Sequence, residues 1–202
     1  MKQLLKRGLI IAVGLLAAGC AAGEKKQAPA STELTVAPYP LSEKEEELIS
    51  KTGVSHIEFF TLDGTLKKGE DIQYTIVLYE KGKFKQNMLF SYGETENKFK
   101  DKLISFGMRD AGGDQQATTL LEGSPDGLSS TEFSHKATGW TFSSLIHEKV
   151  TLKKNKPLYL SGWAGTSKNT MRSLNSEHGE LPEGLKEMEV ALLYKIEWTD
   201  AE

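Results

Sequence analysis

The stretch Val190-Ala-Leu-Leu-Tyr-Lys-Ile-Glu-Trp198 has the most regular alternation of residue types in the chain, and it decides the predicted fold. Apolar side chains recur there at every second residue from Val190 to Trp198, while Lys195 and Glu197 stand between them. A period of two places the apolar set on one face of a β-strand and the charged set on the other. The stretch therefore predicts a strand with one face toward a core and the other toward solvent.

A second alternating pattern predicts a hairpin over residues 72–92. Residues 72–78 place Ile, Tyr, Ile and Leu on one face, Lys81-Gly82 supplies a turn, and residues 84–92 alternate back with Phe, Gln, Met, Phe and Tyr. Asp63-Gly64 predicts another turn. Shorter patterns predict further strands at residues 57–59, 104–108, 118–121, 131–135, 141–152 and 158–163.

About eight or nine short strands with almost no helix indicate an all-β fold, an antiparallel β-sandwich in one domain over residues 41–202. An immunoglobulin-like and a jelly-roll topology fit this pattern equally well. One short N-terminal helix is expected between Ser42 and Thr52, because Ser42-Glu-Lys-Glu45 has the spacing of a capping box and Gly53 follows. Leu48 and Ile49 would give that helix an apolar side for docking.

Residues 1–20 have the order of an export signal. Three basic residues precede an apolar run over residues 9–16, and the small residues Ala17-Ala18-Gly19 stand directly before Cys20. The run is too short to cross a bilayer, which takes about 20 apolar residues. This order is typical of a secretory signal peptide, here residues 1–19.

The same residues resemble the signal of bacterial prolipoproteins, in which small residues end at a cysteine. The resemblance implies a diacylglyceryl group on the Cys20 thiol, cleavage after Gly19, and acylation (for example with palmitate) of the new amino terminus. Ala17 departs from the family's usual Leu, and the resemblance covers residues 1–20 alone. It implies a protein anchored to the bacterial cell membrane, facing outside the cytoplasm. Ala21 is not the Asp that resembles an inner-membrane retention signal, so the outer membrane is an alternative in a two-membrane bacterium.

Residues 20–40 are expected to be the lipidated cysteine and a flexible tether, since residues 21–40 are rich in Ala, Gly, Lys, Pro, Ser and Thr. Removal of residues 1–19 leaves 22 Lys and Arg against 28 Asp and Glu, a formal charge of −6. Only Arg109 and Arg172 then carry guanidinium groups, so the composition disfavours nucleic acid as a partner. It leaves the oligomeric state open.

Motifs of the common enzyme classes are missing. The chain has no G-x-S-x-G, no S-x-x-K after the tether and no phosphate-binding glycine loop, and its only cysteine is Cys20. The four histidines have no metal-ligand spacing, and Arg109–Asp114 has fewer acidic residues than a calcium loop, so no metal or other cofactor is predicted.

The long connection Gly162–Glu187 is the best sequence candidate for a binding surface, because loops of that length in compact domains are often functional. It contains Trp163 among small neighbours, followed by Arg172 and His178, the residue types of a recognition hot spot. The alternative is that Trp163 is a core residue that closes the sandwich. Trp140 could likewise be an edge aromatic or a core side chain.

The leading functional hypothesis is a lipid-anchored lipoprotein that acts as a non-catalytic binding or interaction module in the cell envelope, for an envelope protein or a small ligand. One alternative is an envelope hydrolase whose residues converge in space, with His147, His178 and Glu180 as first suspects. The other is a structural or inhibitory envelope protein.

Overall fold

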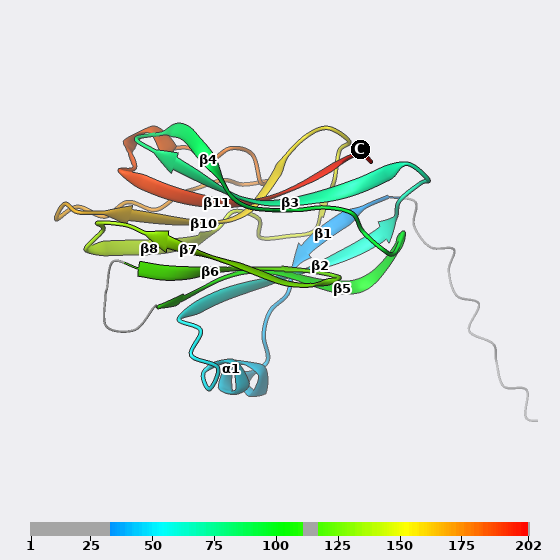
Figure 1. Ribbon diagram of the computed structural model, residues 1–202, viewed down its shortest axis with the longest axis horizontal. Helices are drawn as coiled ribbons and strands as arrows, with labels where there is room; N and C mark the ends of the chain where they lie inside the picture. Colours follow the sequence, from blue (N-terminus) through cyan, green and yellow to red (C-terminus); the bar gives the residue numbers. More distant parts are fainter. Residues whose placement is uncertain (1–32, 111–116, 202) are drawn as a thin grey trace, which may run out of the picture.

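The computed structural model describes residues 33–110 and 117–201, which fold into two antiparallel sheets that lie face to face (Figure 1). One sheet has six strands in the order β7-β6-β5-β2-β1-β9, and the other has five in the order β4-β3-β11-β10-β8. The strands are β1 Thr35–Pro38, β2 His56–Thr65, β3 Glu70–Glu80, β4 Lys83–Ser91, β5 Lys98–Asp110, β6 Ala117–Ser124, β7 Gly127–Ser134, β8 Gly139–Ser144, β9 Val150–Thr151, β10 Leu158–Thr166 and β11 Val190–Asp200. The helices are α1 Glu43–Ile49 and the 3-10 turn η1 Leu185–Glu187.

The core lies between the sheets, and β11 supplies its centre. Leu192, Tyr194 and Ile196 are buried on the inner face of β11, opposite Phe60 and Phe106 of the six-stranded sheet. β11 pairs with β3 on one side and β10 on the other, so its apolar face meets core residues along its length. The expectation of an all-β chain of antiparallel strands with one short α-helix is confirmed.

The expected tether is wrong at its C-terminal end. β1 pairs antiparallel with β2, with Val36 opposite Leu62, and with β9. Leu34 and Val36 are fully buried. The segment of Leu34 and β1 thus buries two apolar side chains, and the folded body begins before residue 35 rather than at residue 41.

Asp63-Gly64 is not a turn, because β2 continues through it to Thr65. The register with β5 shifts between Leu62 and Gly64, as at a β-bulge. Gly64 has a φ of 129°, and a Cβ there would stand 2.3 Å from the carbonyl oxygen of Glu33. The glycine therefore lets the start of the body pass directly over the bulge.

We expect Gly64→Ala to lower the free energy of unfolding by about 2 kcal/mol more than Gly69→Ala. Both glycines have positive φ, but a Cβ at Gly69 would meet nothing within 4 Å. The pair therefore separates backbone strain, which both variants share, from the contact with Glu33. Urea unfolding of the two variants measures the difference, and equal losses would show that the chain before β1 yields freely.

The strand expected over residues 141–152 is two strands in different sheets. β8 ends at Ser144 and pairs with β10, whereas β9 pairs with β1 in the facing sheet. Leu145 and Ile146 are buried at the crossing between them. The exposed residues His147–Lys149 separate the two strands, but apolar residues on both sides of them do not reveal that the chain changes sheets.

The hairpin of β3 and β4 has the expected turn, but the apolar residues of its second strand, β4, do not share one face as expected. Two register shifts interrupt the pairing of β4 with β3, so the residues of β4 do not keep one alternation. Phe84, Phe90 and Tyr92 are 61%, 45% and 56% exposed. β4 is an edge strand, and its aromatic side chains line the surface instead of the core.

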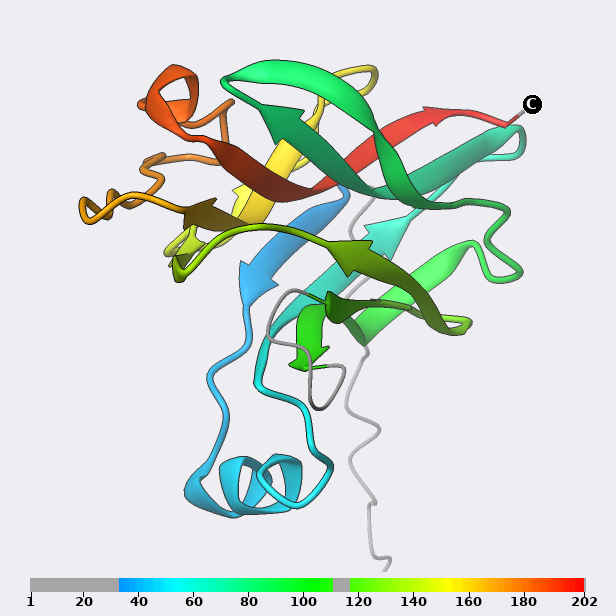
Figure 2. The same cartoon turned by 60° about the vertical axis from the view of Figure 1, so that its left-hand side comes forward.

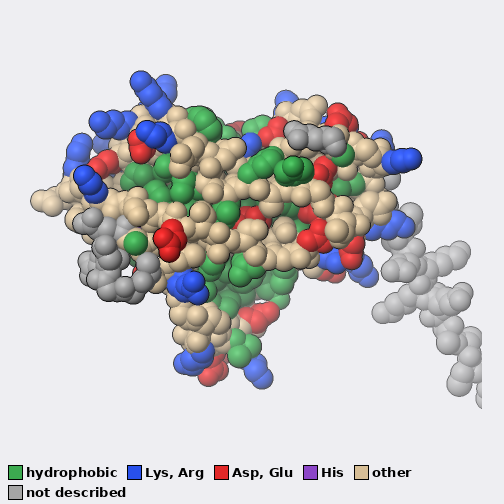
Figure 3. Space-filling model, in the orientation of Figure 1, with side chains coloured by type: hydrophobic (Ala, Val, Ile, Leu, Met, Phe, Trp, Pro, Cys, Tyr) green, Lys and Arg blue, Asp and Glu red, His purple; other side chains and the backbone are tan. Residues whose placement is uncertain are grey.

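The helix α1 begins with the predicted capping box. The Ser42 Oγ accepts a hydrogen bond from the Glu45 backbone N–H, and the Ser42 N–H donates to the Glu45 carboxylate at 2.7 Å. The helix projects from the six-stranded sheet and buries none of its residues (Figures 1 and 3). Leu48 is 61% exposed and Ile49 is half-buried, so the described residues cover only part of the expected docking side. No helix in those residues has the length and apolarity needed to cross a membrane.

A second apolar cluster covers the outer face of the five-stranded sheet. Leu193 of β11 and Tyr159 of β10 point to that face and are buried beneath the segment that follows β10. Residues 167–189 supply the cover, through the buried side chains of Leu174, Leu185 and Met188. Figure 2 shows this segment, in orange, lying beside β10 and β11. The long connection is therefore packed onto the sheet, and its packing shapes a groove of about 720 Å³.

Candidate functional site

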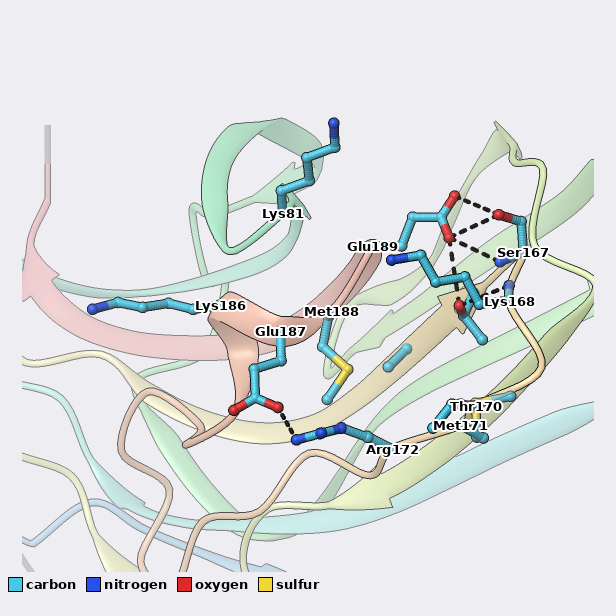
Figure 4. A pocket seen from close by; sticks show the side chains of 13 residues that line it. Lys81, Ser167, Lys168, Thr170, Met171, Arg172, Lys186, Glu187, Met188 and Glu189 are labelled. Atoms are coloured by element: carbon cyan, nitrogen blue, oxygen red, sulfur yellow. Dashed lines mark hydrogen bonds and ion pairs between the residues drawn. The ribbon is translucent and has the colours of Figure 1, made fainter.

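The basic groove is the depression that residues 164–172 and 186–189 form with Lys81 (Figure 4). Its volume is about 720 Å³. The end of β10 and the segment after it make one wall, and η1 with Met188 and Glu189 makes the other. Lys81 comes from the β3–β4 turn, whose backbone N–H donates to the Glu189 carbonyl at 3.0 Å. Three parts of the chain that are distant in sequence thus meet at one surface.

Glu189 ties the two walls together. Its carboxylate accepts hydrogen bonds from the backbone N–H of Ser167 at 2.9 Å and from the Ser167 hydroxyl at 3.0 Å. The Thr166 hydroxyl donates to the same carboxylate at 3.4 Å. These bonds to Ser167 hold the pKa of Glu189 below its ordinary value. Because its carboxylate accepts these hydrogen bonds, Glu189 connects the two walls at one end of the groove.

Four cationic side chains line the basic groove: Lys81, Lys168, Arg172 and Lys186. Arg172 forms an ion pair with Glu187, while none of the three lysines has an ion pair within the described residues. In Figure 4 Lys168 reaches across the groove, whereas Lys81 and Lys186 extend outward at its rim. With Glu187 and Glu189 as the acidic lining residues, the groove has a formal charge of +2 on a chain of net charge −3.

Trp163 does not belong to this surface. It is 1% exposed and points to the inner side of β10, where its ring packs edge-on against Phe133 at a centroid distance of 5.7 Å and lies 5.1 Å from His135. The expected reachable indole is therefore wrong, and the alternative of a core residue is correct. The small neighbours of Trp163 accommodate the ring inside the body instead of exposing it.

His178 and Arg172 lie at different ends of β10. Gly179, beside His178, accepts a hydrogen bond from Tyr159 near the start of the strand, whereas Arg172 shares the groove with residues at its end. His178 is 62% exposed and stands 4.0 Å from the Glu148 carboxylate. Of the three predicted binding residues, only Arg172 is in the groove.

The residues first suspected of hydrolase chemistry do not converge. His147, His178 and Glu180 are all exposed. Glu180 accepts a hydrogen bond from the Ser176 hydroxyl at 3.5 Å. Within the described residues, His147, His178 and Glu180 form no buried acid–base pair with one another. Within residues 33–110 and 117–201, no three His, Cys, Asp or Glu side chains gather as metal ligands.

Two other predicted features lie wholly or partly outside the described residues. Cys20 precedes them, and the Arg109–Asp114 loop falls outside after Asp110. Trp140, by contrast, is 52% exposed on the edge strand β8. It borders a cavity of about 30 Å³ with His56 and His135, which is the space of about one water molecule and too small for a ligand.

The sequence prediction missed the three lysines of the basic groove. Each stands in a polar turn or loop, where a lysine is the ordinary solvent-facing residue. Their common position follows from the packing of residues 167–189 on the five-stranded sheet, which an amphipathic pattern does not encode. The only signal available was the length of the connection after β10.

Comparison with known proteins gives one match. The family described as the YgaN domain matches residues 35–198, a span that begins with the first residue of β1 and ends within β11. No curated protein and no solved structure matches the chain.

Proposed function

We propose that this chain, which belongs to the YgaN domain family, is a lipid-anchored extracytoplasmic lipoprotein that binds its ligand in the basic groove without catalysing a reaction. The observation that carries the binding function is the groove itself, with its volume of about 720 Å³ and three lysines that have no ion pair among the described residues. The two facing sheets act as a single β-sandwich scaffold that fixes the groove.

The anchor rests on the resemblance of Ala17-Ala18-Gly19-Cys20 to a prolipoprotein signal. The arrangement of the body is compatible with it. In Figure 1 the segment that covers the five-stranded sheet lies at the left, while β1 begins at the right. A lipid on Cys20 would therefore attach to the end of the body that is distant from the basic groove, which leaves the groove open to partners outside the membrane.

The ligand class follows from the charge of the groove. Lysines that form no ion pair favour an anionic group, because binding replaces water around the ammonium groups with a complementary charge. Lys168 is the one of the three whose charge also acts on Glu189. The hydroxyl of Thr170 and the side chain of Met171 also line the groove, so it offers both polar and apolar contacts. We infer a ligand that carries carboxylate or phosphate groups.

The anchor is tested with Cys20→Ser. Full-length wild-type protein expressed in a bacterium is expected in the membrane fraction, with the mass of a diacylglyceryl group on the mature chain. The variant, which has no thiol to modify, is expected in the soluble extracytoplasmic fraction. A wild-type chain with an unmodified Cys20 by mass spectrometry would overturn the anchor and leave the groove unaffected.

The groove is tested with the variant Lys168→Ala/Lys186→Ala and citrate as the probe. Binding measured by calorimetry is expected to weaken about tenfold in this variant, and in the wild type to weaken as salt is added. Lys44→Ala/Lys51→Ala is the matched control, because it removes two exposed lysines of the helix region. Equal affinities of the two double variants would contradict anion binding in the basic groove.

A further inference from the structure

The acidic cleft lies at the C-terminal end of β4, whereas Lys81 of the basic groove precedes the start of that strand. The edge strands β4 and β7 of the two sheets approach each other. The cleft is lined by Tyr74, Ser91, Tyr92, Glu94, Asp126 and Leu128 with their neighbours, and its volume is about 320 Å³. This volume falls in the range of small-molecule sites. Glu122 of β6 lies directly behind the lining residue Ser91, whose hydroxyl donates to its carboxylate at 2.6 Å.

Two carboxylates fix the backbone that carries Glu94. Asp71 is buried at the start of β3 and accepts hydrogen bonds from the N–H groups of Gly93 at 2.7 Å and of Glu94 at 3.1 Å. Asp126 accepts from the N–H of Thr95 at 3.1 Å and from its hydroxyl at 2.7 Å. The loop after β4 is thus held from both sheets, which positions Glu94 as a lining residue of the cleft.

Two buried polar groups next to the acidic cleft have no partner for one of their atoms within the described residues. Glu122 is 1% exposed, and its second carboxylate oxygen, Oε1, forms no hydrogen bond there. The hydroxyl of Tyr194, which is 0% exposed, also lacks one, whereas the hydroxyl of the lining residue Tyr74 interacts with the Glu94 carboxylate. Buried polar groups without partners are rare in native proteins, because each one loses its water without compensation.

The charges of the cleft are equally uncompensated. Burial raises the pKa of Glu94 to about 7, the hydrogen bond from Tyr74 opposes this rise, and the nearby Asp126, Asp71 and Glu122 add to it. Burial also raises the pKa of Glu122. No lysine or arginine of the described residues forms an ion pair with Glu94 or Glu122, and Lys102, which is nearby, pairs with Glu96 at 2.8 Å. The cleft thus gathers acceptors that lack a cationic donor.

We infer that the acidic cleft is a second binding site, which takes an organic cation through a primary ammonium group that contacts Glu94, with the buried carboxylate of Glu122 behind Ser91 as a second nearby charge. An ammonium group has three N–H donors and no acceptor, which suits the Glu94 carboxylate and the hydroxyl oxygens of Tyr74 and Ser91 in the lining. Tyr92 and Leu128, which are 56% and 67% exposed at the rim, offer aromatic and apolar surface to the carbon chain of such a ligand.

A bare metal ion fits less well. Its inner-sphere ligands would be two carboxylates at most, since no three acidic or imidazole side chains of the described residues converge. Calcium takes six to eight oxygen ligands, often several of them carboxylates. The cleft of about 320 Å³ is also roughly ten times the volume that one water molecule occupies in the liquid, so an ion would leave it mostly empty.

The test uses butylammonium as the probe, with butanol and calcium as the two alternatives. Backbone amide NMR of the folded protein at pH 8 is expected to show butylammonium shifting the signals of residues 92–95 and 122–129. Butanol has the same chain without the charge and is expected to bind at least tenfold more weakly. Equal shifts with butanol, or tighter binding of calcium than of butylammonium, would overturn the inference.

Variants locate the binding. Glu122→Gln keeps the shape of the side chain and is expected to weaken butylammonium binding about tenfold, because it removes a buried negative charge close behind the site. Glu94→Gln provides a second, independent reading of the same site. Glu132→Gln is the matched control, because it removes the same charge from an exposed position on β7. Retained affinity in both cleft variants would show that the probe binds elsewhere.

Discussion

Replacing Trp163 by alanine is expected to lower the free energy of unfolding by about 3–5 kcal/mol. The indole is 1% exposed and packs against Phe133 and His135 between the two sheets. Its removal would leave a cavity at the centre of β10 that rigid neighbouring strands cannot close. Urea unfolding followed by circular dichroism measures the loss.

Trp140→Ala is the matched control, since it removes the same side chain from an exposed edge position. The Trp140 ring is 52% exposed and meets Phe142 edge-on at 6.3 Å. We expect it to lower stability by less than about 1 kcal/mol. If both variants lost the same stability, Trp163 could not be the core residue that its burial indicates.

The position of Trp163 also predicts coupling with Gly165. A Cβ on Gly165 would stand 2.4 Å from the indole ring and 2.7 Å from the Cβ of Ala137. Gly165→Ala is therefore expected to destabilise the wild type through a clash, and to destabilise the Trp163→Ala variant much less because the indole is gone. A double-mutant cycle should give a coupling of about 1 kcal/mol or more in that direction. Additive losses would mean that the indole moves aside freely.

The alternation of apolar residues was enough to predict the strands that span the core. β3, β5 and β11 are long, and large apolar residues recur at every second position over several turns of the pattern, so their type is clear from the sequence. The pattern did not show that their other faces are also partly buried, as Leu193 of β11 is. β1 and β9 have only four and two residues, which is too few for a period to appear. They are strands because their partners supply the hydrogen bonds and because Leu34 and Val36 fill the core.

The candidate sites depended on information that one strand does not contain. Trp163 and Trp140 both stand beside glycines in alternating stretches, and only the position of β10 inside its sheet and of β8 at the edge separates them. Glu122 did leave a signal, since it continues the inward series of Thr118 and Leu120 on β6. The strand predicted from the sequence ends at Leu121, one residue too early to include Glu122, so Glu122 is not recognised as an inward-facing residue.

The pH dependence of stability gives the second large effect, and it originates in the acidic cleft. The folded pKa of Glu94 is about 7, above its ordinary value of 4.5. A carboxyl group with a raised pKa favours folding when protonated, so its contribution is complete below about pH 4.5 and is lost as the pH rises through 7. After allowance for the partial exposure of Glu94, the loss is on the order of 2 kcal/mol. Glu122 acts in the same direction because burial also raises its pKa.

Other groups titrate nearby, so the prediction concerns the difference between variant and wild type. Burial lowers the pKa of His135, which makes the folded state more stable as the pH rises through 6.5 and so opposes Glu94. Glu94→Gln leaves that histidine unchanged and removes one titration from the cleft. The groups that face Glu94 are Asp71, Tyr74, Lys102, Glu122 and Asp126.

We therefore expect Glu94→Gln to match the wild type at pH 4.5 and to exceed its stability at pH 8 by about 2 kcal/mol. Urea unfolding at half-unit pH steps would trace the difference, with Glu132→Gln as the exposed control that should stay within about 0.5 kcal/mol of the wild type throughout.

Carboxylates that destabilise a native protein in this way are typical of functional sites, where a bound ligand interacts with their charge. Butylammonium should accordingly raise wild-type stability at pH 8 and leave that of Glu94→Gln nearly unchanged, because a cation in the cleft relieves the same repulsion that the substitution removes. A variant less stable than the wild type at pH 8 would instead mean that the ionised Glu94 already has its partner in the fold.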